Sequence, residues 1–145
     1  MKYIAYGSNM VRSQMAQRCP GAKLIGAGYL EGAQLEFYLH ATVERSRIKD
    51  SRVPVVVWEI TKDHEERLDR YEGFPTYYVK KRARVRMKDG SVIEGMVYVM
   101  RLIRTAPPMA SYLQGIRKAY QEFGMEDDID TVLEPAYLRS VLRPA

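Results

Sequence analysis

The sequence predicts an α+β fold in which short strands curve into a small barrel and helices lie beside it. Residues 53–60 contain an unbroken run of three valines and a tryptophan, as expected of a strand that is covered on both faces. Residues 24–30 are also strand-like, and Gly26 and Gly28 within them indicate bending or a close approach of two backbones, as in a small curved barrel. Residues 61–72 are predicted to form a helix, which Thr61 or Asp63 can cap and Gly73 can end.

Two further short strands are predicted between these segments. Residues 34–39 alternate between polar and apolar side chains, so Leu35, Phe37 and Leu39 are expected to share one face. Residues 41–43 form the next strand.

A hairpin is predicted over residues 78–88 and 92–102, because Asp89-Gly90 between them is a turn signal. One face of its first strand carries five basic side chains: Lys80, Arg82, Arg84, Arg86 and Lys88. Such a row is typical of a solvated strand face that also protects a sheet edge, and this is the interpretation we favour. Nucleic-acid binding through the same row is the alternative.

Three more helices complete the predicted elements. Residues 10–18 follow the first strand, with Ser8 or Asn9 as the predicted cap. Residues 109–123 carry a stripe of apolar and tyrosine side chains that is typical of core packing. The last helix has Pro135 in its first turn.

Length and composition predict one globular domain that covers residues 1–145, with 46% apolar and 28% charged residues. No stretch approaches the roughly 20 apolar residues of a membrane helix. The N-terminus lacks the apolar region of a signal peptide, so we expect a cytoplasmic protein without a membrane partner. The single cysteine, Cys19, excludes an internal disulfide and fits a reducing compartment.

Neither a cofactor nor a metal is predicted. His40 and His64 have no partner at metal-ligand spacing, and the sequence contains no phosphate-binding loop, dinucleotide fingerprint or nucleophile elbow. The net charge of +5 permits an anionic partner without requiring one.

The most informative turn consists of Tyr6, Gly7, Ser8 and Asn9, which follow the first strand. Gly7 permits a tight turn or a close approach to a ligand. The amide groups that begin the next helix favour an anion above the turn. Taken alone, a turn of this composition is more often an ordinary chain reversal than an anion pocket, so other residues must decide.

The predicted helix over residues 61–72 ends on Glu72, with Gly73 as its stop signal. His64, Leu68 and Glu72 are four residues apart and therefore share a face that points inward. Partial burial and the negative end of the helix dipole both raise the pKa of such a carboxyl, which suits a general base near neutral pH. A solvated glutamate at a helix end is the alternative.

In their order and spacing, these motifs resemble the γ-glutamylcyclotransferase superfamily, including its AIG2-like members. One hallmark is the Tyr-Gly-Ser-Asn turn at residues 6–9, and the second is Leu-Asp-x-x-Glu-Gly at residues 68–73. Tyr78 then opens a charged strand. Further matches are Ala41-Thr42-Val43, Val57-Trp58, Ala106-Pro107-Pro108, Tyr112 and Ile116.

The resemblance implies a small closed, mixed β-barrel with flanking helices. It also implies that Glu72 is the catalytic acid/base and that Tyr78, or the adjacent Tyr77, forms a hydrogen bond in the same pocket. The α-carboxylate and amine end of a γ-glutamyl group would be bound by Tyr6, Gly7, Ser8 and Asn9. The implied reaction is an intramolecular cyclisation, of acyltransferase or lyase type, that expels an amine or amino acid and forms 5-oxoproline without a metal.

Two other functions remain open at the level of the sequence. A non-catalytic module could keep the same pocket for a small amino-acid-like anion. The basic strand over residues 80–88 could bind nucleic acid, although we expect a small γ-glutamyl compound rather than nucleic acid as the partner.

Overall fold

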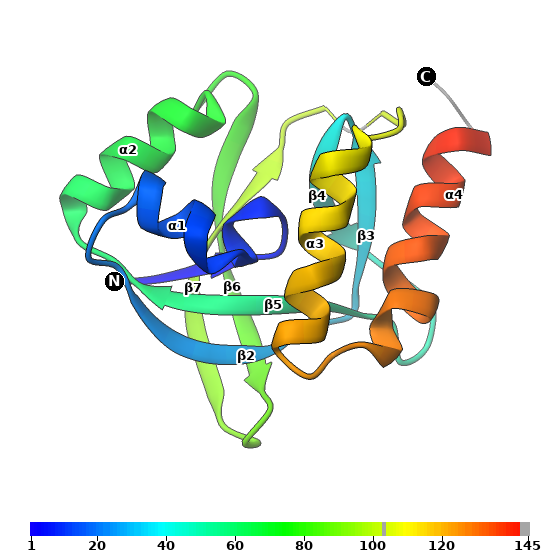
Figure 1. Ribbon diagram of the computed structural model, residues 1–145, viewed down its shortest axis with the longest axis horizontal. Coiled ribbons are helices and arrows are strands. Elements are labelled where there is room, and N and C mark those ends of the chain that lie inside the picture. Colours follow the sequence, from blue (N-terminus) through cyan, green and yellow to red (C-terminus); the bar gives the residue numbers. More distant parts are fainter. Residues whose placement is uncertain (103, 143–145) are drawn as a thin grey trace.

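The structure, a computed structural model, describes residues 1–102 and 104–142. Five strands close into a barrel in the order β1 (Lys2–Ala5), β5 (Arg52–Glu59), β2 (Lys23–Glu31), β6 (Tyr78–Met87) and β7 (Val92–Met100). β1 runs parallel to β7 and closes the barrel, whereas the other neighbours pair antiparallel. The predicted closed, mixed barrel with flanking helices is therefore confirmed (Figure 1).

The two glycines of β2 account for the curvature of the barrel. The register of β2 against β5 shifts between Leu24 and Gly26. A Cβ atom at Gly28 would lie 2.5 Å from the carbonyl oxygen of Arg86 in β6. Since no side chain fits at that distance, Gly28 allows β2 to cross closely over β6.

A separate two-stranded sheet, β3 (Ala33–Tyr38) and β4 (His40–Arg45), lies beside the barrel. Leu35 and Phe37 are fully buried as predicted, but the expected burial of Leu39 is wrong, because the chain turns there with a φ of 65° and leaves this side chain 56% exposed. Glu36, predicted on the polar face, is buried and accepts a hydrogen bond from Arg139 at 3.2 Å.

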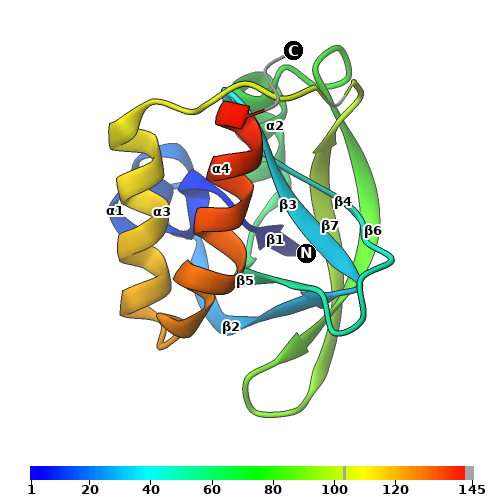
Figure 2. The same ribbon diagram turned by 90° about the vertical axis from the view of Figure 1, so that its right-hand side faces the viewer.

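The helices form two groups (Figures 1 and 2). One group contains the short 3₁₀ helix η1 (Ser8–Met10), α1 (Arg12–Arg18) and α2 (Lys62–Glu72). The other contains α3 (Ala110–Glu122), the π-helical turn η2 (Ile129–Leu133) and α4 (Glu134–Leu142). The two groups meet where η1 and α1 lie beside α3. Figure 2 shows α3 and α4 along one flank, with β3 next to α4.

Local signals explain where α2 begins and ends. The Thr61 side chain accepts from the backbone N–H of His64, whose ring accepts from the backbone of Thr61. Gly73 ends the helix in the left-handed conformation, with a φ of 66°. The cap predicted for the first helix is wrong: Val11 precedes α1, and the Ser8 and Asn9 side chains bind other groups instead.

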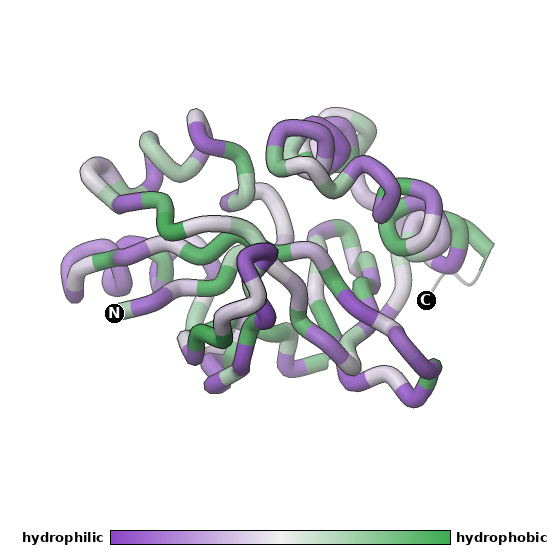
Figure 3. Tube along the Cα trace, turned by 90° about the horizontal axis from the view of Figure 1, so that it is seen from below, coloured by the Kyte–Doolittle hydropathy of each residue, from purple (hydrophilic) through white to green (hydrophobic). Residues whose placement is uncertain are grey.

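One continuous core joins the barrel to both helix groups. Figure 3 shows hydrophobic and hydrophilic residues interspersed along the chain, and in β5 residues 53–58 are all buried. The largest fully buried side chains of the core include Tyr120, Phe37, Ile4, Met10 and Met15. Among the described residues, no helix is long and apolar enough to cross a membrane.

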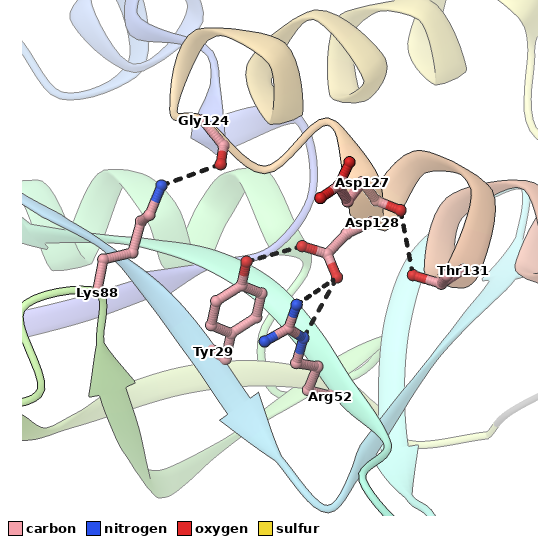
Figure 4. Close-up of polar contacts among 7 residues, drawn as sticks. All are labelled: Tyr29, Arg52, Lys88, Gly124, Asp127, Asp128 and Thr131. Atoms are coloured by element: carbon pink, nitrogen blue, oxygen red, sulfur yellow. Dashed lines mark hydrogen bonds and ion pairs between the residues drawn. The ribbon is translucent and has the colours of Figure 1, made fainter.

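A buried carboxylate attaches the C-terminal helices to the barrel. Asp128, between α3 and η2, accepts from the hydroxyl of Tyr29 at 2.7 Å and from Nη2 of Arg52 at 3.2 Å (Figure 4). Arg52 also lies over the Tyr29 ring, 3.9 Å from its centroid. Nearby, Lys88 donates to the carbonyl oxygens of Phe123 and Gly124 at the end of α3.

Candidate active site

A cavity of about 770 Å³ opens between the helix groups and the barrel. Its walls come from the turn after β1, the β3–β4 turn, the end of α2, the start of β6, the end of β7 and α3. The residues predicted from the sequence all line it: Tyr6, Gly7, Ser8, Asn9, Glu72, Tyr77 and Tyr78. The structure thus brings together two motifs that are far apart along the chain.

Gly7 lies where the turn after β1 passes close to α3. A Cβ atom there would lie 2.9 Å from the hydroxyl oxygen of Tyr112. Tyr6 is buried and donates its hydroxyl proton to the carbonyl oxygen of Tyr98 at 2.6 Å. The turn is therefore anchored on one side by Tyr6 and fits against Tyr112 only because residue 7 has no side chain.

The side chains of Ser8 and Asn9 bind protein groups. Oγ of Ser8 accepts from Nη1 of Arg18 at 2.8 Å. Asn9 accepts from the same Nη1 and donates to the hydroxyl of Tyr3 at 2.9 Å. Trp58 donates to the backbone carbonyl of Asn9 at 3.0 Å. Asn9 therefore shapes the cavity wall from a buried position, 3% exposed.

Glu72 is the only carboxylate among the described residues that line the cavity. It occupies the last position of α2, where Leu68 on the same face is fully buried. Burial raises the pKa of Glu72 to about 7, and the positive charge of Arg18 partly offsets this rise. Near neutral pH, the group is therefore divided between its protonated and ionised forms.

Tyrosines dominate the rest of the wall, which contains eight of the 11 tyrosines in the chain. Tyr78 donates to the carbonyl oxygen of Ala41, and the amide of Ala41 donates to the hydroxyl of Tyr112, both at 2.9 Å. Burial first, and the charge of Glu72 second, raise the pKa of Tyr78 and Tyr3 well above the usual value. These hydroxyl groups stay protonated and surround Glu72 without charge.

Tyr77 and Tyr78 differ in environment although both line the cavity. Tyr77 is 72% exposed, whereas Tyr78 is half-buried and hydrogen-bonded. The geometry therefore favours Tyr78 as the inner residue and places Tyr77 at the mouth.

Sequence reasoning missed four residues around this site. Tyr3, Tyr98 and Tyr112 line the cavity, and Arg18 lies behind the 6–9 turn. The helix with Tyr112 is predicted to pack in the core; Ile116 is fully buried there, and Tyr112 packs against the core while also lining the cavity. Tyr112 is one of the residues that match the family pattern, but no motif marks Tyr3, Tyr98 or Arg18, because their roles depend on contacts between separate segments.

The basic row of β6 is largely engaged within the protein. Arg82 pairs with Glu94, Arg86 pairs with Glu31, and Lys80 pairs with Glu65 and Asp69. This pairing supports the interpretation of the row as a solvated strand face. Among the described residues, no group of three or more His, Cys, Asp or Glu side chains could hold a metal ion.

Comparison with known proteins agrees with this geometry. A family model described as Gamma-glutamyl cyclotransferase, AIG2-like matches residues 3–114. The gamma-glutamylcyclotransferase of Homo sapiens is 29% identical over 136 residues, which cover 85% of this chain and 71% of the human protein. Its Mus musculus counterpart is 28% identical over 145 residues, covering 91% and 76%.

A solved structure of a gamma-glutamyl cyclotransferase superposes with a TM-score of 0.83 at 26% identity, over 92% of this chain and 86% of that chain. The matched residues 3–114 include the turn after β1, the end of α2 and the start of β6, which together form most of the cavity. From its sequence, its barrel and its cavity alike, this chain belongs to the γ-glutamyl cyclotransferase, AIG2-like family.

Proposed function

We propose that this protein releases 5-oxoproline and a free amino acid or amine from a γ-glutamyl substrate. The observation that carries the proposal is the position of Glu72, whose side chain shares a cavity with the 6–9 turn and has a pKa of about 7. A carboxyl group with a pKa near the working pH can both accept a proton and return it.

In this mechanism the substrate supplies its own nucleophile. Glu72 takes a proton from the α-ammonium group, and the freed amine attacks the γ-carbonyl carbon to close a five-membered ring. Collapse of the tetrahedral adduct breaks the bond to the leaving nitrogen, to which Glu72 returns the proton. The ring nitrogen also loses its extra proton to the leaving group, so the products are the neutral lactam 5-oxoproline and an amine in its ammonium form. Holding the chain curled would supply proximity, an effect worth up to several kcal/mol.

The turn after β1 offers groups that could hold the substrate. Within residues 1–102 and 104–142, the backbone N–H groups of Ser8 and Asn9 donate no hydrogen bond. Such donors suit the α-carboxylate of the glutamyl unit or the oxyanion of the adduct. The protonated tyrosines around Glu72 add neutral donors.

The mouth of the cavity suggests the class of leaving group. Four strongly exposed apolar or aromatic side chains line it, namely Leu39, Tyr71, Tyr77 and Leu102. Arg70 and Arg101 line the same mouth, and no acidic residue lies among the described lining except Glu72. We therefore propose a leaving group with an apolar side chain and a carboxylate, which is an amino acid, in preference to a cationic amine.

Product formation from a panel of γ-glutamyl compounds tests the reaction and the leaving group together. γ-Glutamyl-phenylalanine is expected to give 5-oxoproline with a higher kcat/KM than γ-glutamyl-phenethylamine, which lacks the carboxylate, and than a γ-glutamyl polyamine. The kcat/KM is expected to rise with pH through about 7, as Glu72 ionises. Equal rates for all three compounds would contradict the assignment of the leaving group alone.

Glu72→Gln is expected to lower kcat at least roughly 100-fold, because it removes the proton carrier and keeps the size. Glu66→Gln, at an exposed position of the same helix, is the matched control and should retain activity. Equal activity of the two variants, or no 5-oxoproline from any compound, would refute the mechanism. Ligand binding without turnover would instead identify a non-catalytic module.

A further inference from the structure

Arg18 lies at the end of α1, behind the cavity wall, and joins residues from two separate elements. Its Nη1 donates to Ser8 and Asn9 in the turn after β1. Its Nη2 donates to the hydroxyl of Tyr71 on α2, and its guanidinium carbon lies 3.4 Å from the centroid of the Tyr71 ring. One side chain therefore connects the turn, the mouth of the cavity and the helix that ends on Glu72.

Asn9 depends on Arg18 for the orientation of its amide. Trp58 holds only the backbone carbonyl, and Tyr3 accepts from Nδ2, which leaves Oδ1 to Arg18. Ser8 would be free to rotate without its bond to Nη1. Since the planar guanidinium presents donors in a fixed fork, it restrains both side chains at once.

An arginine at this position lowers the stability of the fold, so packing alone does not explain why residue 18 is an arginine. The Nε atom of Arg18 is buried, and it has no hydrogen-bond partner among the described residues. An unsatisfied donor on a charged group lowers stability, so a purely structural role would be served as well by an apolar side chain.

Arg18 also acts on the charge of Glu72 through space. Four tyrosines, from β1, the following turn, β6 and α3, also interact with the charge of Glu72: Tyr3, Tyr6, Tyr78 and Tyr112. Burial raises the pKa of each, so they remain neutral. Exposed Arg70, Arg101 and His40 line the mouth, while Arg18 is the cation that opposes the rise in the pKa of Glu72.

We propose that Arg18 is a positioning residue of this active site, which orients Ser8 and Asn9 in the cavity wall and favours the ionised form of Glu72 that accepts the substrate proton. The inference rests on the proposed function. The residues that Arg18 contacts lie on η1 and α2, and none of them is part of the leaving-group mouth except Tyr71.

Three variants separate positioning from charge. Arg18→Met removes both, Arg18→Lys keeps the charge without the fork, and Arg67→Met removes one charge from an exposed position of α2 outside the cavity lining. Arg18→Met is expected to lower kcat/KM roughly 10- to 100-fold, as misplaced groups do. Its acid limb in the pH profile should move to higher pH. Arg18→Lys should lose activity while its acid limb stays in place, and Arg67→Met should match the unmodified protein.

Two measurements on the ligand-free protein keep the inference testable without turnover. Carbon-13 NMR of glutamate-labelled protein, assigned with Glu72→Gln, should show a higher pKa for Glu72 in Arg18→Met but not in Arg67→Met. Amide hydrogen exchange of Met10 and Val11, whose N–H groups donate to the carbonyl oxygens of Gly7 and Ser8, should be faster in both Arg18 variants. If wild-type protein makes no 5-oxoproline but these two shifts occur, the proposed function fails while the role of Arg18 in the site is supported.

The inference is overturned if Arg18→Met and Arg67→Met have the same kcat/KM, pH profile and exchange rates. Should Arg18→Met not fold, Arg18→Lys decides the question. Wild-type activity and exchange in Arg18→Lys would then show that the fork does not position the turn.

Discussion

At the scale of single residues, the burial that gives Glu72 a pKa suited to proton transfer also makes the folded state less stable above that pKa. Burial moves its pKa from 4.5 to about 7, so the folded protein binds this proton more tightly than the unfolded chain does. The stabilisation of the folded state by this bound proton is fully present below pH 4.5 and is lost as the pH rises through about 7. The loss amounts to roughly 3 kcal/mol at most.

Glu72→Gln is therefore expected to gain stability relative to the wild type as the pH rises. The change in unfolding free energy on substitution should be more favourable at pH 8 than at pH 5 by up to roughly 3 kcal/mol, because glutamine does not titrate. Urea unfolding at both pH values measures this difference. Glu66→Gln, on the exposed face, should show no such dependence, and an equal effect of Glu72→Gln at both pH values would contradict the burial of its charge.

Gly7 illustrates a different restriction, in which the absence of a side chain matters. Gly7→Ala would place Cβ 2.9 Å from the Tyr112 hydroxyl oxygen, which is held by the amide of Ala41. Displacing that hydroxyl should cost about 1 kcal/mol of stability and lower kcat/KM by shifting the turn. Adding Tyr112→Phe removes the obstructing oxygen, so the double variant should recover part of the lost stability. Additive losses in thermal unfolding would argue against this contact.

At the scale of elements, α2 is a helix whose two ends have different tasks. Its start is secured by the reciprocal bonds of Thr61 and His64, and its end presents Glu72 before the left-handed Gly73. Neither Thr61 nor His64 lines the cavity, whereas Glu72 at the other end of the helix does. A change at the cap should consequently affect stability more than chemistry.

Thr61→Ala is expected to lower the free energy of unfolding by about 1 kcal/mol, because the N–H of His64 loses its acceptor. The kcat/KM at 25 °C should stay close to that of the wild type. Ser111→Ala, at an exposed position of α3, provides a control with a smaller effect. A large loss of activity in Thr61→Ala at full folding would show that the cap also positions Glu72.

At the scale of the whole molecule, the contacts of Asp128 with Tyr29 and Arg52 join the C-terminal helices to the barrel, outside the lining of the cavity that contains Glu72. Asp128→Asn is expected to lower the free energy of unfolding by roughly 1–3 kcal/mol, since it removes the charge that Arg52 and Tyr29 contact. The exposed neighbour variant, Asp127→Asn, should change it far less. Denaturant unfolding followed by circular dichroism compares the two, and equal effects would show that the buried pair adds nothing.

Much of the architecture could be predicted from local patterns. The strand at β5, the hairpin of β6 and β7, the capped α2 and the glycine-dependent curvature of β2 all follow from residues close together in the chain. Two of the predictions were wrong because a side chain from another part of the fold forms a hydrogen bond there. Arg18 donates to Ser8 and Asn9, the side chains expected to cap α1, and Arg139 donates to the buried Glu36.

The sequence by itself determined the elements of this protein and the two motifs of its site, since propensity, capping and periodicity act over a few residues. Only the tertiary structure decided that the two motifs share one cavity, that Tyr3 and Tyr98 also line it, and that Arg18 lies behind it. The same holds for the pKa of Glu72, because desolvation and through-space charge depend on how segments far apart in the chain pack around a group.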